Sequence, residues 1–140
     1  MADGREPETA LRDVLWRELA IGSAQELKAR VVQADFGAAG FAALAPCIDR
    51  LAAAGDPVAA AIIETSAAAL VELVGGVAGT LALPAPAVAV VGGAITHLRA
   101  LHQSFHRGLA TRLPDAVPTD PLGDACDGAL QMAEALLQQG

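Results

Sequence analysis

The pattern of apolar and polar positions predicts a chain made mainly of helices. Apolar side chains recur every three or four residues in four segments, as one buried face of a helix requires. Ser23, followed three residues later by Glu26, is typical of a capping box at a helix start. The predicted helices span residues 9–19, 23–32, 38–54, 57–81, 95–110 and 121–138.

Three of these helices carry apolar stripes that we expect to face the core. In the helix over residues 38–54 the stripe consists of Phe41, Leu44, Ile48 and Leu51. In the helix over residues 57–81 it consists of Val58, Ile62, Ala69, Leu73 and Val77. In the helix over residues 95–110 it consists of Leu98, Leu101, Phe105 and Leu109. Pro46 lies inside the first of these helices and predicts a kink or a restart there.

Two further helix starts share an aspartate–proline pair. Asp56-Pro57 follows Gly55, which suits the left-handed position that ends the preceding helix. Aspartate suits the N-cap and proline the first helical position. Asp120-Pro121 repeats the pair, so we expect the last helix to begin there.

Residues 87–91 (AVAVV) are short, β-branched and uniformly apolar, which predicts a strand buried on both faces of a parallel sheet. Residues 113–118 are predicted to be a second short extended piece. The expected fold class is therefore α/β and predominantly helical, with one or two short parallel strands. One or two strands are too few for a stable sheet, so we expect part of the fold to lie outside this chain.

Composition narrows the class of protein. The chain has 140 residues, 54% apolar and 3% aromatic, and a net charge of −7. It is long enough for one domain with its own core, and we treat residues 1–140 as a single domain. Without a basic cluster, nucleic-acid binding is not expected. A small nucleotide is compatible with this charge, because backbone N–H groups can hold phosphates.

The sequence favours a cytoplasmic protein without a membrane span. Residues 67–91 are apolar, but they include Glu72, several glycines and prolines, and an amphipathic pattern. The first residues are polar and lack the apolar region of a signal peptide. Cys47 and Cys126 have no metal-binding spacing, and we expect reduced, partly buried thiols.

Two glycine-rich segments resemble phosphate loops. Residues 75–80 (GGVAGT) lack the Walker A lysine and fall inside a helical pattern, so we interpret them as small residues that allow close helix packing. Residues 90–94 (VVGGA) follow a strand and precede a helix, and ligands of open α/β sheets gather at that end of a strand. Both a ligand-binding turn and a bare strand–helix turn fit this pattern.

No catalytic or metal-binding constellation is evident. His102 and His106 are four residues apart, but no third ligand accompanies them, and we expect boundary side chains rather than a metal site. His97 is a weaker candidate for a contact at the rim of a nucleotide site. Asp124 and Asp127 are expected in the first turn of the last helix, where the helix dipole favours carboxylates.

Four segments, in order, resemble N-acetylglucosamine kinases of the BadF/BadG/BcrA/BcrD ATPase family. Residues 3–21 (DGREPETALRDVLWRELAI) are similar to the family's turn before a leucine-rich helix. Residues 31–63 contain D-F, the alanine-rich A-x-L-A-P helix and the G-D-P helix start. Residues 87–109 resemble the V-x-L-V-G-G-V strand–turn–helix with its later L-x-x-x-F, and residues 117–133 resemble the terminal P-x-x-x-P-x-x-G-A-L-x-L-A helix. The resemblance covers nearly the whole chain.

The resemblance implies the C-terminal portion of a two-lobed sugar kinase, in which each lobe is built on an actin-like, ribonuclease-H-like core. The family binds ATP, with Mg²⁺, and an amino sugar in the cleft between the lobes. Gly92 and Gly93 match the diglycine that packs against the adenosine, and Ala42 matches a helix alanine that lines the nucleotide. Ala94 replaces the family's usual valine and is expected to belong to the same wall.

The family's phosphate motifs, D-G-G-G-T and G-T-G-S, and its catalytic aspartate have no match in this chain, so the N-terminal lobe is expected to be absent. We therefore expect no catalytic residues and no kinase activity from this chain alone. Two alternatives remain. One is an activator-type ATPase of the same superfamily, although Cys47 and Cys126 lack the context of its iron–sulfur site. The other is a non-catalytic helical module that binds a partner. Unpaired strand edges also lead us to hypothesise a homo-oligomer.

Overall fold

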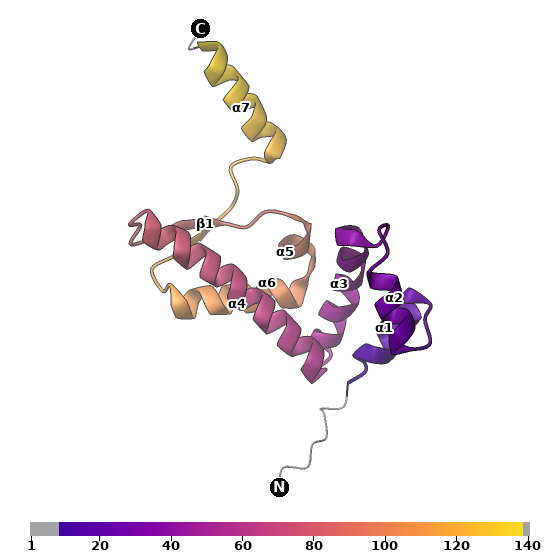
Figure 1. Cartoon of the computed structure of the whole chain (residues 1–140). Coiled ribbons are helices and arrows are strands. Elements are labelled where there is room, and N and C mark those ends of the chain that lie inside the picture. Colours follow the sequence, from indigo (N-terminus) through magenta and orange to yellow (C-terminus); the bar gives the residue numbers. More distant parts are fainter. Residues whose placement is uncertain (1–8, 139–140) are drawn as a thin grey trace.

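A computed structural model describes residues 9–138, which are predominantly helical with two short parallel strands (Figure 1). The first seven elements are α1 (Leu11–Leu19), α2 (Ala24–Val31), α3 (Gly37–Ala53), α4 (Pro57–Thr80), β1 (Ala87–Ala89), α5 (Gly93–His97) and α6 (Arg99–Arg112). They are followed by β2 (Val117–Thr119) and α7 (Ala125–Gln138). The turn predicted before the first helix falls mostly in residues 1–8 and lies outside the described residues.

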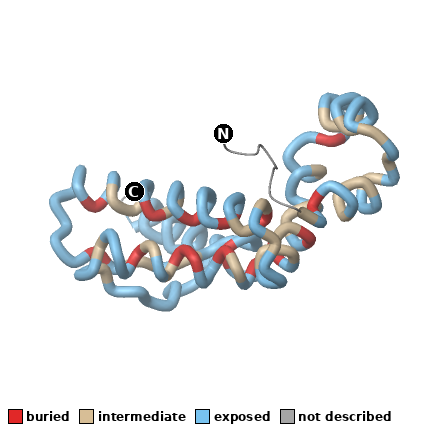
Figure 2. The backbone as a smooth tube through the Cα atoms, turned by 90° about the horizontal axis from the view of Figure 1, so that it is seen from below, coloured by how far each residue is buried: buried red, intermediate tan, exposed pale blue. Residues whose placement is uncertain are grey.

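The core lies between α4 and α6, with α3 packed against both. Buried residues follow the inner sides of these helices and are red in Figure 2. The buried cluster consists of Ile63, Ala67, Val71, Ile95, Leu98, Leu101, Phe105 and Leu109. All four residues of the stripe predicted for the helix over residues 95–110 belong to this cluster, which confirms that prediction.

Local capping signals place several helix starts correctly. The hydroxyl of Ser23 accepts a hydrogen bond from the Glu26 N–H (3.2 Å), and the Glu26 carboxylate accepts one from the Gly22 N–H (2.8 Å). Asp56 caps α4 by accepting bonds from the N–H groups of residues 58 and 59. Gly55 has φ +92°, as a helix-ending glycine requires.

Asp56 also connects the first helix to α4. Its carboxylate accepts hydrogen bonds from the Thr9 hydroxyl (2.8 and 2.9 Å) and from the Ala10 N–H (2.7 Å). The capping bond from the Ala59 N–H contributes most, and together with the bonds from Thr9 and Ala10 it holds the pKa of Asp56 below its ordinary value. One carboxylate therefore serves two helix N-termini.

The stripe predicted for the third helix is only partly correct. Phe41 is 57% exposed, whereas Leu44, Ile48 and Leu51 are half-buried. Cys47 is buried and its thiol contacts the Leu44 carbonyl oxygen (2.9 Å). The helix runs through Pro46 without the predicted restart. Because alanines lie on several sides of α3, the spacing of its apolar residues alone does not determine which side is buried.

The stripe predicted for the long helix is wrong. Ala59, Ile63, Ala67, Val71 and Ala78 are its buried residues, whereas Ile62, Ala69, Leu73 and Val77 are exposed. Helix α4 is apolar nearly all round, so two alternative faces satisfy the same helical period. The packing against α6 selects the face one residue further along the helix.

By length and composition, α4 is the one helix among residues 9–138 that could cross a membrane. The core helix of a folded domain passes the same test, and one side of α4 packs against α3 and α6. This helix is weak evidence for a membrane span.

The two strands pair in parallel, with Ala87 opposite Val117 and Ala89 opposite Thr119. This confirms a second strand and its parallel direction, but the strand begins at Val117, later than the predicted extended piece over residues 113–118, because residues 114 and 115 form a turn. The expectation that the first strand is buried on both faces is wrong within this chain. Val88 and Val90 are half-buried against the helical core, but Ala87, Ala89 and Val91 are exposed. The described residues cover one face of the sheet and leave the other open.

The helix predicted over residues 95–110 is divided into α5 and α6 at Leu98. Leu98 has φ −91° and ψ 102°, an extended conformation, and its side chain is buried in the core. The apolar period continues across the break, which is why spacing alone predicted one helix.

The last helix begins later than Asp120-Pro121 predicted. Asp124 caps α7 by accepting hydrogen bonds from the N–H groups of Cys126 (2.7 Å) and Asp127 (3.0 Å). The Asp127 carboxylate accepts one in return from the Asp124 N–H (2.8 Å). This reciprocal pair provides a stronger helix start than a single aspartate followed by proline. The helix extends away from the rest of the chain (Figure 1), and none of its residues is buried.

Candidate functional site

The diglycine turn joins the carboxyl end of β1 to α5. Gly92 has φ +104° and ψ 151°, a backbone conformation that side-chain-bearing residues rarely adopt. A Cβ built on Gly92 would meet no atom within 4 Å, and one on Gly93 would meet only His97 at 3.9 Å. The turn is therefore open on its outer side, so a ligand can approach its backbone without displacing side chains.

The four predicted wall residues are all exposed. They are Ala42, Gly92, Gly93 and Ala94. Helix α3 and helix α5 pack against the same core cluster, through Ala45 and Ile48 on α3 and Ile95 on α5. This shared support puts the helix that carries Ala42 on the same body as the turn. None of the four residues lines the cavities described below.

Asp49 fixes α3 against α6 and was not singled out from the sequence. Its Oδ1 accepts hydrogen bonds from the N–H groups of Ala100 (2.9 Å) and Leu101 (3.1 Å). Asp49 is buried, and these donors are two of the four N–H groups that the start of α6 leaves unpaired. No signal in the sequence pointed to this role, because spacing predicted one continuous helix over residues 95–110 and therefore no helix start at Leu98.

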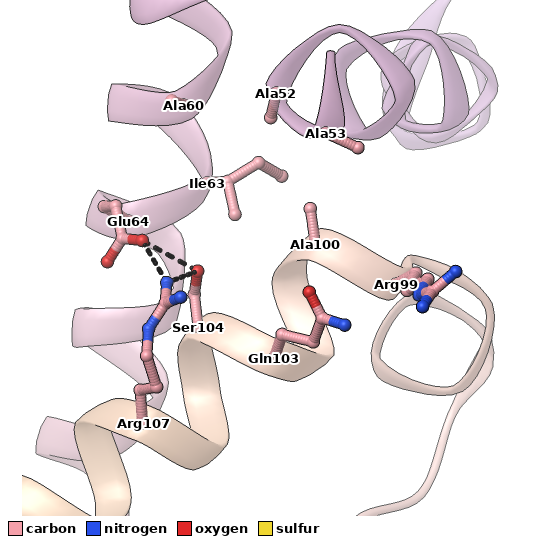
Figure 3. Close-up of a pocket in the computed structure, with 10 residues that line it drawn as sticks. All are labelled: Ala52, Ala53, Ala60, Ile63, Glu64, Arg99, Ala100, Gln103, Ser104 and Arg107. Atoms are coloured by element: carbon pink, nitrogen blue, oxygen red, sulfur yellow. Dashed lines mark hydrogen bonds and ion pairs between the residues drawn. The ribbon is translucent and has the colours of Figure 1, made fainter. Parts of the chain in front are cut away.

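A cavity of about 370 Å³ lies where α3, α4 and α6 meet (Figure 3). Alanines and Ile63 form its apolar walls, and charged or polar side chains lie on α4 and α6. The lining residues are Ala52, Ala53, Ala60, Ile63, Glu64, Arg99, Ala100, Gln103, Ser104 and Arg107.

The polar groups on one side of this cavity satisfy one another. Glu64 Oε1 accepts hydrogen bonds from the Ser104 hydroxyl (2.8 Å) and from Arg107 (2.7 Å), and Arg107 also donates to Ser104 (2.9 Å). The cluster bridges α4 and α6 (Figure 3). Since the serine lies against a carboxylate and an arginine, with no histidine lining the cavity, the group is a structural link rather than a nucleophile with its base.

A second, open cavity of about 320 Å³ lies between the end of α4 and β1. Its walls are apolar and uncharged. They are formed by Leu73, Val74, Val77, Ala78, Leu83, Pro86, Ala87, Val88 and Ala89. This open cavity lies between the exposed side of α4 and the strand that leads into the diglycine turn.

Of the other sequence candidates, His97 lies beside the turn on α5, whereas the second glycine-rich segment and the two cysteines lie on other helices. Residues 75–80 lie within α4, as predicted, but a Cβ on Gly76 or Gly79 would meet nothing within 4 Å, so these two glycines do not mediate close packing among the described residues. The close helix contact is made instead at Gly108, where a Cβ would lie 3.1 Å from Val71. Both cysteines are free; Cys126 is exposed rather than partly buried.

The histidine pair lies on α6. His106 is half-buried and burial lowers its pKa, to which the neighbouring His102 adds. No group of three or more histidine, cysteine, aspartate or glutamate side chains among residues 9–138 is arranged to hold a metal ion. A magnesium site would therefore need ligands other than a cluster of such side chains in the described residues.

No family model, curated protein or solved structure matches the chain. The functional interpretation therefore depends on the site geometry and on the sequence resemblance alone.

Proposed function

We propose that this chain supplies the adenosine-facing wall of the ATP site in a cytoplasmic amino-sugar kinase. The wall consists of Ala42 on α3 and of Gly92, Gly93 and Ala94 at the turn. In this proposal the fold is the C-terminal part of the second lobe of an actin-like ATPase. The complete protein transfers the γ-phosphate of ATP to the 6-hydroxyl of N-acetylglucosamine or a related amino sugar.

The observation that carries the proposal is the positive φ of Gly92, a conformation that favours glycine, three residues after the parallel strand β1 ends at Ala89. Because β1 pairs in parallel with β2, the turn lies at the carboxyl edge of the sheet, where α/β proteins bind ligands. The open space above Gly92 and Gly93 leaves room for a planar base or ribose.

Phosphoryl transfer requires groups that this chain does not offer. Positioning of the γ-phosphate and Mg²⁺, and a general base for the sugar hydroxyl, belong in this proposal to the family's first lobe and phosphate loops. The isolated chain is therefore expected to be inactive. ATP-dependent phosphorylation of N-acetylglucosamine by the purified 140-residue chain would contradict this expectation.

Backbone amide NMR with millimolar ADP tests the wall directly, because it detects weak binding. We expect shifts centred on Gly92, Gly93, Ala94 and Ala42, and their loss in Gly92→Val. Gly76→Ala is the matched control, since Gly76 lies in open space on α4 and should leave the shifts unchanged. Shifts centred elsewhere, or none at any concentration, would rule the wall out.

A second candidate function is a helical module that associates with a second copy of itself. The observation that favours it is α7, which has no buried residue and exposes Leu130, Met132, Leu136 and Leu137. Exposed apolar faces of this kind commonly mark interfaces. Sedimentation over a range of concentrations is the test, and a monomer at every concentration would reject this candidate.

A further inference from the structure

Helix α6 places two imidazole rings against each other on its outer side. His102 and His106 are one helical turn apart, and their Nε2 atoms are separated by 3.2 Å. The ring centroids are 4.3 Å apart. The two Nε2 atoms therefore lie within hydrogen-bonding distance of each other.

This separation matches the bite of two imidazoles on a single metal ion. Metal–nitrogen bonds of about 2.0–2.1 Å place two ligand nitrogens about 3.3–3.4 Å apart in a tetrahedral site and about 2.8–3.0 Å apart at a right angle. The observed 3.2 Å lies between these values. Without a metal, one Nε2 donates a hydrogen bond to the other, and a bound ion would replace that proton.

The surroundings hold one ring in place and leave the pair accessible. The ring of His106 packs edge-on against Phe105, with centroids 5.4 Å apart and planes at 76°, and Phe105 is itself buried in the core. His102 is exposed, so solvent reaches the pair of imidazole rings. Because the His106 ring is already held in place, less side-chain entropy is lost when an ion binds, and the exposed His102 lets the ion enter from solvent.

We propose that His102 and His106 form a two-ligand site for one divalent transition-metal ion that prefers imidazole, of the Zn²⁺ or Cu²⁺ class, with water in the remaining positions. Hard cations such as Mg²⁺ and Ca²⁺ prefer oxygen ligands and are excluded by this donor set. The site is independent of the nucleotide wall, so either can fail without the other.

The test is a calorimetric titration of the tag-free full chain with ZnCl₂, carried out in a Cys126→Ser background because that exposed thiol also binds Zn²⁺. One equivalent is expected to bind, and His102→Ala or His106→Gln should weaken binding about tenfold or more. MgCl₂ should give no heat of binding. Proton NMR of the three histidine rings should show shifts at His102 and His106 and none at His97.

His97→Ala is the matched control, since this third histidine lies on α5 and is not part of the pair. It should leave the affinity for Zn²⁺ unchanged. His102 is exposed, so His102→Ala tests the ligand without disturbing the core. The proposal is overturned if Cys126→Ser alone abolishes the binding of Zn²⁺, or if no saturable binding is measured. It is also overturned if adding His102→Ala to Cys126→Ser leaves the affinity for Zn²⁺ unchanged.

Discussion

The three-helix body of α3, α4 and α6 and the region of β1, β2 and α7 differ in how much of their apolar sequence they bury. Six of the eight residues of the core cluster lie on α4 and α6, and a buried aspartate cap joins α3 to α6. The sheet has two strands of three residues each, one open face, and a following helix with no buried residue. The three helices bury a shared core, although Phe41, Leu73 and Val77 stay exposed, whereas the described residues leave one face of the sheet and all of α7 uncovered.

This difference bears on function because the diglycine turn lies at the boundary between the two regions. Its inner side rests on the helical body through Ile95, and its outer side faces open space. A stable support with an uncovered outer side is the arrangement expected for one wall of a shared site.

Leucine truncation should separate the two regions most strongly. Leu109→Ala removes a side chain that is 2% exposed in the core and should lower the free energy of unfolding by about 2–5 kcal/mol. Leu137→Ala, at 82% exposure in α7, should change it by no more than about 0.5 kcal/mol. Urea denaturation of both variants measures the difference. Similar losses in the two variants would show that α7 is packed in solution.

Removal of the buried cap should weaken the helical body next. Asp49→Ala leaves the N–H groups of Ala100 and Leu101 without their acceptor and should cost about 0.5–2 kcal/mol. Asp49→Asn keeps a carbonyl acceptor and should lose less. Equal losses from both variants would mean that packing, rather than the hydrogen bonds, makes the residue important.

Glycine substitutions should distinguish the two sides of the helical body. Gly76→Ala, on the open side of α4, should stabilise the protein by about 0.5–1 kcal/mol, because alanine is the better helix former. Gly108→Ala should gain less or lose stability, because its Cβ would lie 3.1 Å from Val71. Thermal unfolding of both variants gives the comparison, and an equal gain would indicate that α4 and α6 are packed less closely than described.

The smallest effect concerns acid stability at the N-terminal helix. The pKa of Asp56 is lowered by its hydrogen bonds, so its contribution is present above the ordinary pKa of 3.8 and is lost as the pH falls below that value through the folded-state pKa. The stability difference between the wild type and Asp56→Asn should therefore shrink between about pH 5 and pH 2. A difference that stays constant over this range would show that the charge of Asp56 is not involved.

Local signals predicted the fold best where a few neighbouring residues determine the outcome. Ser23 and Asp56 cap the predicted helices because their partners lie two or three residues away. The buried face of α4 was predicted wrongly because alanine and valine occupy both faces. The division at Leu98 was missed because it depends on Asp49, about fifty residues earlier, and on burial in a core that spacing does not reveal.

The candidate site could be predicted only in part. The strand–diglycine–helix order was readable from residues 87–95, and the structure adds the open space and the positive φ of Gly92. The role of Ala42 rests on the resemblance, since an exposed alanine carries no chemical signal of its own. The 3.2 Å approach of the two Nε2 atoms was beyond sequence spacing, because it depends on side-chain rotamers.

Amide hydrogen exchange of the full chain, measured residue by residue at low protein concentration, is the most direct test of the central claim. That claim is that α3, α4 and α6 form a folded core, whereas the described residues leave one face of the sheet and α7 uncovered. We predict slow exchange in the central turns of α4 and α6, and exchange near the rate of an unfolded chain in α7 and on both strands. Protection of α7 and the strands equal to that of α4 in the monomer would contradict the account, because it would mean that this chain covers its own sheet.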